Sequence, residues 1–70
     1  MSVARVVEIS STSTKSFEDA VVQGIERANQ TLRNVKSAWV KEQEAEVNNG
    51  KVVAYKVNLK VTFVLDGQVA

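Results

Sequence analysis

The stretch NNGKVVAYKVNLKVTFVL, residues 48–65, decides the fold of this chain. Asn49-Gly50 predicts a tight hairpin turn, because both residues tolerate the positive φ angles that such turns require. Beyond the turn, apolar and polar residues alternate, which is the period of a strand with one buried face. The expected buried face carries Val53, Tyr55, Val57, Leu59, Val61, Phe63 and Leu65, and the opposite face carries Ala54, Lys56, Asn58, Lys60 and Thr62.

Residues 35–47 on the other side of the turn predict the partner strand of the hairpin. Two apolar residues in the first half of this strand, Ala38 and Val40, occupy even-numbered positions, and two in the second half, Ala45 and Val47, occupy odd-numbered positions. A β-bulge near Lys41 or Glu42 would bring these apolar residues of both halves to the same face.

The first half of the chain predicts one strand and one helix. Residues 3–9 are rich in β-branched side chains and indicate a strand, which the hydroxyl residues 10–14 are expected to end. A helix is expected over residues 14–31, with Ser13 as its N-cap and a second capping pattern in Ser16 and Asp19. Its apolar stripe comprises Phe17, Ala20, Val21, Gly24, Ile25, Ala28 and Leu32. Glycine on that stripe predicts a close approach of the helix to the sheet.

Length and composition limit the function classes. Seventy residues make one domain, residues 1–70, near the lower size limit for an unaided core. The absence of Cys and His excludes disulfides and Cys/His zinc sites, and argues against enzymatic catalysis. A net charge of +1 argues against binding to nucleic acid. No apolar run resembles a signal peptide or a membrane span, so we expect a cytoplasmic protein with no membrane partner.

The expected elements differ in length, and this difference predicts assembly. A helix of about 17 residues spans roughly 25 Å, whereas a strand of about 15 residues spans roughly 50 Å. One helix therefore covers about half of the apolar face of the hairpin. We expect copies of the chain to cover the remainder in a homo-oligomer, which also hides the open edges of the sheet.

The order strand, helix, long strand, long strand resembles the dodecin family, and the resemblance covers nearly the whole chain. The matching residues are Val7-Glu8-Ile9, Thr12-Ser13, Ala20, Ile25, Arg27, Ala28, Thr31-Leu32-Arg33, Val40-Lys41-Glu42, Tyr55, Val57, Leu59, Val61, Phe63 and Leu65. The resemblance implies an α+β fold, in which a three-stranded antiparallel sheet partly wraps one helix. It also implies a hollow shell of twelve subunits that stores flavins (FMN, FAD or riboflavin) without turnover.

Three positions depart from the family pattern for flavin binding. Ser37 stands where the family has its stacking Trp, Lys56 where it has a flavin-contacting Gln, and Val64 where many bacterial members have Arg. Trp39 lies two residues from Ser37 and is expected on the same face, about 7 Å further along the strand. Trp39 is therefore either a substitute platform for a flat ligand or a side chain buried between subunits.

Three glutamates, Glu42, Glu44 and Glu46, share one face of the second long strand, and two interpretations of them remain open. They can form cross-strand pairs, with Lys56, Asn58 and Lys60 expected opposite. Alternatively, symmetry-related copies can gather them into a Ca²⁺ site, with Asp66 as a further ligand. The second interpretation describes a structural or cation-binding particle that no longer binds flavin.

Overall fold

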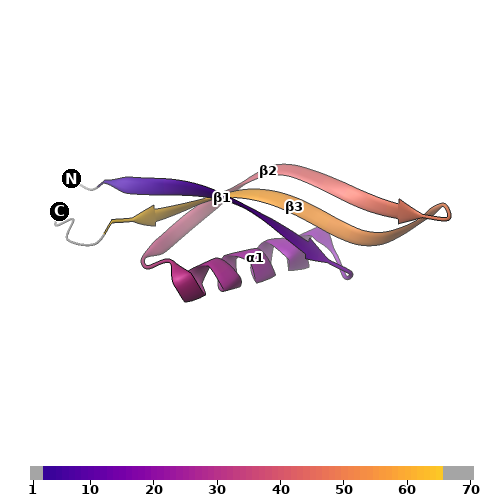
Figure 1. Ribbon diagram of the computed structural model, residues 1–70, viewed down its shortest axis with the longest axis horizontal. Helices are drawn as coiled ribbons and strands as arrows, with labels where there is room; N and C mark the ends of the chain where they lie inside the picture. The colour runs from indigo at the N-terminus through magenta and orange to yellow at the C-terminus, as the bar shows by residue number, and fades with distance from the viewer. Residues whose placement is uncertain (1–2, 66–70) are drawn as a thin grey trace.

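The computed structural model describes residues 3–65 and contains one helix and three strands. The elements follow one another as β1 (Ala4–Ser13), α1 (Phe17–Thr31), β2 (Val35–Asn48) and β3 (Lys51–Val64). The strands form one antiparallel sheet in the order β1-β3-β2, and α1 lies against one face of it (Figure 1). The expected α+β class, element order and three-stranded antiparallel sheet are confirmed.

Strand β1 is longer than the sequence predicts. It was expected to end at Ile9, but it continues through Ser13, with Ser10 opposite Asn58 and Ser13 opposite Tyr55. Hydroxyl residues favour turns only where no stronger partner competes for their backbone groups. Here the long strand β3 supplies that partner, so sheet pairing overrides the local preference.

Helix α1 begins at Phe17, because Ser16 and not Ser13 is its N-cap. The Ser16 hydroxyl accepts a hydrogen bond from the Asp19 backbone N–H at 2.9 Å. The buried Ser13 ends β1 instead: its hydroxyl donates to the Asp19 carboxylate at 2.6 Å and accepts from the Lys15 backbone N–H at 2.9 Å. Of the two capping patterns in the sequence, the second is correct, and the helix starts three residues later than expected.

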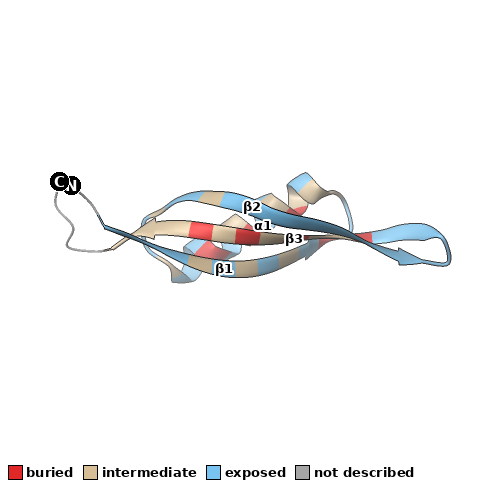
Figure 2. Cartoon of the chain, turned by 90° about the horizontal axis from the view of Figure 1, so that it is seen from above, coloured by how far each residue is buried: buried red, intermediate tan, exposed pale blue. Residues whose placement is uncertain are grey.

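The core lies between α1 and the middle of β3. Val57, Leu59 and Val61 are fully buried there and pack against the apolar stripe of the helix. Figure 2 shows that buried positions of the sheet lie on β3. Gly24 allows the helix to approach the sheet closely. A Cβ atom at this position would lie 3.0 Å from both Leu59 Cδ1 and Ser11 Cβ. The close approach that the sequence predicts is confirmed.

Three irregularities interrupt the pairing of β2 with β3. One falls between Val40 and Glu42 and confirms the expected bulge, and the others lie between Val35 and Ser37 and between Glu46 and Val47. The last one overturns the expected alternation near the turn. Val53 is passed over in the register, and it is 46% exposed, whereas Ala54 is buried.

The hairpin of β2 and β3 extends well beyond the helix (Figure 1). The 15 residues of α1 span about 22 Å, whereas the longest dimension of the chain is 52 Å. Strand β2 is exposed over most of its length, and both β1 and β2 are edges of the sheet (Figure 2). Large apolar side chains that remain exposed include Val6, Val40, Val47, Val52 and Val53. The helix therefore leaves a substantial apolar surface uncovered, as the element lengths predict.

Candidate functional site

The candidate site lies on the face of the sheet opposite α1, which we call the polar face. Successive strand residues point to opposite faces, so the buried Val57, Leu59 and Val61 place the intervening residues of β3 on this side. The register adds the neighbours of these residues on β1 and β2. The polar face thus comprises Val6, Glu8, Ser10, Thr12, Ser37, Trp39, Glu42, Glu44, Lys56, Asn58, Lys60 and Thr62.

Trp39 and Ser37 share the polar face. Ser37 lies opposite Thr62 and Trp39 opposite Lys60, two residues further along β3, so the expected common face is confirmed. The Trp39 side chain is 64% exposed, an unusual state for the largest apolar ring in the chain. An exposed indole can stack on a flat ligand or pack into another protein surface.

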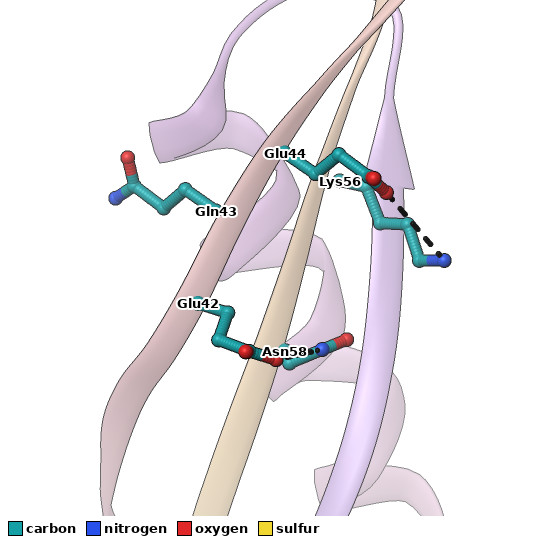
Figure 3. Close-up of a pocket in the computed structure, with 5 residues that line it drawn as sticks. All are labelled: Glu42, Gln43, Glu44, Lys56 and Asn58. Atoms are coloured by element: carbon teal, nitrogen blue, oxygen red, sulfur yellow. Dashed lines mark hydrogen bonds and ion pairs between the residues drawn. The ribbon is translucent and has the colours of Figure 1, made fainter.

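A shallow cavity of about 330 Å³ opens beside the middle of β2. Glu42, Gln43, Glu44, Lys56 and Asn58 line it. In Figure 3, Gln43 points away from the other four side chains, which gather on the polar face. Asn58 Nδ2 donates to Glu42 Oε1 at 2.9 Å, and Lys56 Nζ lies 4.0 Å from Glu44 Oε1. Lys56 is therefore paired with a carboxylate of its own subunit.

Two of the three residues expected opposite the glutamates lie there: Asn58 faces Glu42 and Lys56 faces Glu44. The expectation is wrong for the third, because Lys60 lies opposite Trp39 and Glu46 lies opposite Ala54. The turn pairs Asn48 with Lys51, and one extra residue in β3 then sets the register of the following rows. Lys60 consequently lies next to the aromatic ring of Trp39 on β2, and its glutamate neighbour is Glu8 on β1.

A salt bridge crosses the whole sheet on the polar face. Lys41, in the bulge of β2, donates from Nζ to Glu8 Oε2 of β1 at 3.0 Å, although β3 lies between the two strands. The hydrogen bond and the negative charge of Glu8 raise the pKa of Lys41 above its ordinary value of 10.5. This ammonium therefore stays charged and connects the two edge strands.

The three candidate metal ligands do not form a cation site within one subunit. Glu42, Glu44 and Glu46 follow one another along β2 at spacings of about 7 Å, too far apart for one ion. Among residues 3–65, no three acidic side chains are placed to hold a metal ion together. The further candidate, Asp66, lies outside these residues. No helix within the same range is long and apolar enough to cross a membrane.

Comparison with known proteins gives consistent matches over nearly the full chain. The Dodecin family model matches residues 3–66. The calcium dodecin of Mycobacterium tuberculosis is 33% identical over 63 residues, which cover 90% of this chain and 89% of the relative.

Solved structures agree with these matches. A dodecin from Streptomyces davaonensis is 37% identical with a TM-score of 0.89, over 93% of this chain and 96% of that one. The calcium dodecin structure from Mycobacterium tuberculosis, described with a novel calcium-binding site, is 29% identical with a TM-score of 0.80. That match covers 99% of both chains.

Proposed function

The chain belongs to the dodecin family, and from this premise we propose that it forms a hollow homododecameric shell that binds and stores a small flat ligand. The proposal includes a single domain over residues 1–70, a cytoplasmic location and no chemical turnover. FMN is the first candidate ligand, with FAD and riboflavin as related ones. The observation that carries the ligand is Trp39, an exposed aromatic ring on the polar face next to the family's stacking position, Ser37.

Assembly is supported by the apolar surface that the helix leaves uncovered. Val40, Val47, Val52 and Val53 are 44–63% exposed in a single chain. Burial of each such side chain is worth up to about 1.5–3 kcal/mol, which favours association over an exposed patch. The edge strands β1 and β2 also carry backbone groups that neighbouring copies can cover.

Ligand binding is supported by the shape and chemistry of the polar face. Ser37 cannot stack on a ring, but Trp39 lies about 7 Å along the same face and presents a larger surface than any neighbour. Lys60 lies opposite Trp39 on β3, and the adjacent pair of opposed residues, Ser37 and Thr62, has small side chains. A flat ligand on Trp39 therefore has open space on one side, toward Ser37.

Titration with FMN tests this function. Stacking on an indole quenches flavin fluorescence, so we expect strong quenching that saturates near about one flavin per subunit. The measurement is flavin fluorescence at increasing protein concentration, with free FMN as the reference. Absence of quenching at roughly tens of micromolar flavin would contradict the ligand part of the proposal.

The native mass of the same sample tests the shell. We expect an assembly, because the apolar hairpin needs cover from other copies, and the resemblance to dodecins sets its expected mass at about twelve times the 7.7 kDa of the chain. Native mass spectrometry or light scattering supplies the number. A folded species of a single 7.7 kDa chain in dilute buffer would contradict the assembly.

A second candidate function is a structural or Ca²⁺-binding particle, which the calcium dodecin relative favours. Glu42, Glu44 and Glu46 of symmetry-related copies would then supply the oxygen ligands. We instead expect Ca²⁺ and chelator to leave the melting temperature unchanged, because Glu42 and Glu44 already have partners in their own subunit.

The melting experiment separates the two functions. Ca²⁺ at about 100 times its dissociation constant would stabilise the particle by about 2.7 kcal/mol, which is a shift of several degrees. Mg²⁺ at equal concentration controls for ionic strength. A calcium-specific rise that chelator reverses would support the second candidate.

A further inference from the structure

The sequence alone does not predict which side chains lie next to Lys60. The structure shows these neighbours, and they bear on which ligand the polar face selects. Lys60 pairs with Trp39 on one side and with Glu8 on the other, so the three residues form one row across β2, β3 and β1. Directly opposed side chains in a sheet have Cβ atoms about 4.5–5.5 Å apart. The ammonium group of Lys60 can therefore reach the edge of a ring that stacks on Trp39.

The carboxylate nearest to Lys60 is engaged elsewhere. Glu8, its direct neighbour on β1, accepts a hydrogen bond from Lys41 at 3.0 Å. Of the lysines on or reaching over this face, Lys41 is held by Glu8 and Lys56 lies 4.0 Å from Glu44. Among residues 3–65, Lys60 makes no ion pair within 4.0 Å.

The ammonium group of Lys60 therefore has no carboxylate partner of its own. Glu8 lies between Lys41 and Lys60 and is bridged to Lys41, while Glu42 adds a second carboxylate near Lys41. In the next row toward the turn, the Glu42 carboxylate accepts a hydrogen bond from the Asn58 amide. The row on the other side of Trp39 contains the uncharged Ser37, Thr62 and Val6. An anion beside the Trp39 ring therefore meets one cation without an intramolecular partner, and the space toward Ser37 carries no opposing charge.

We infer that Lys60 is a specificity-determining residue that makes the Trp39 site select flat aromatic ligands carrying an anionic group over neutral ligands with the same ring. This inference rests on the proposed function, since it assigns the ligand class of the same site. Stacking on Trp39 supplies affinity that is common to both ligand types. Lys60 adds an attraction only for the charged one, and salt screens that attraction because the site is open to water.

Paired titrations with FMN and riboflavin test the inference, because the two share one ring system and differ in a phosphate. At low salt, wild type is expected to bind FMN roughly 5- to 10-fold more tightly than riboflavin. Lys60→Gln is expected to reduce this preference to about one and to leave riboflavin affinity unchanged. Raised salt should have the same effect on wild type. Lys51→Gln, an exposed lysine at the start of β3, is the matched control and should keep the preference.

The outcomes separate the inference from the function on which it rests. Equal affinity of wild type for the two flavins, or a preference that survives in Lys60→Gln, would overturn the inference and leave the proposed function standing. Failure of both flavins to bind would overturn the proposed function and the inference together. The native mass of each variant is measured in parallel, so that only assembled particles enter the comparison.

Discussion

Replacing Leu59 with alanine is expected to lower the free energy of unfolding by about 3–5 kcal/mol, a large share of the stability of a chain this small. Leu59 is fully buried at the centre of β3, beneath the closest approach of the helix at Gly24. The substitution removes apolar contacts and leaves a cavity that the rigid sheet and helix fill only in part. Denaturant unfolding followed by circular dichroism measures the loss.

Two further variants make this prediction specific. Val22→Ala changes an apolar residue on α1 that is 47% exposed, and it should alter stability by less than about 0.5 kcal/mol. Leu59→Met nearly keeps the volume of the side chain and should cost less than about 1.5 kcal/mol. If Leu59→Ala unfolds at the same denaturant concentration as Val22→Ala, Leu59 does not hold the core together. A Leu59→Ala chain that never folds agrees with the prediction, and Leu59→Met then supplies the measurable step.

The central features of the fold follow from local sequence. Asn49-Gly50 adopts positive φ at both residues, +53° and +75°, as the hairpin turn requires. The alternation over Val57, Leu59 and Val61 predicts the buried face correctly, because each of these residues contacts the same helix. These features depend on neighbours close in the sequence or on a strict period of two, and both can be read from one chain.

Features that depend on long-range pairing could not be predicted in the same way. Ser10 to Ser13 resemble a loop by composition, and only the availability of β3 as a partner makes them part of a strand. Ser13 and Ser16 are equally good caps by residue type. The structure selects Ser16 because Ser13 is committed to the end of β1 and to Asp19. In each case a distant element decides between two local preferences of similar strength.

In the candidate site, too, local spacing predicts some features, and long-range pairing decides the others. The common face of Ser37 and Trp39 follows from their spacing of two, and the structure confirms it. The neighbour of Trp39 on β3 does not follow, because it depends on how many residues the two irregularities between the turn and Trp39 add to each strand. The Lys41–Glu8 salt bridge was missed for a related reason. It joins the two edge strands across a third one, and a bulge places Lys41 within reach.

Replacing Trp39 with alanine is expected to weaken FMN binding by roughly 5- to 150-fold, which corresponds to the loss of about 1–3 kcal/mol of ring stacking. Trp39 is the one tryptophan of the chain, and Ser37 next to it cannot take over the stacking. Because the ring is 64% exposed in the subunit, its removal disturbs little of the core that Val57, Leu59 and Val61 form. The measurement is the FMN concentration dependence of flavin quenching, with native mass determined on the same material.

Control variants separate stacking from packing between subunits. Val47→Ala removes another exposed apolar side chain of β2, 63% exposed, and should leave FMN affinity unchanged. Trp39→Phe keeps an aromatic face and should recover most of the binding that alanine loses. A ring that only seals a subunit interface behaves differently: its truncation lowers the native mass or the melting temperature, while the particles that remain assembled bind FMN as tightly as wild type. Full quenching by assembled Trp39→Ala particles would therefore assign Trp39 to the interface and remove it from the ligand site.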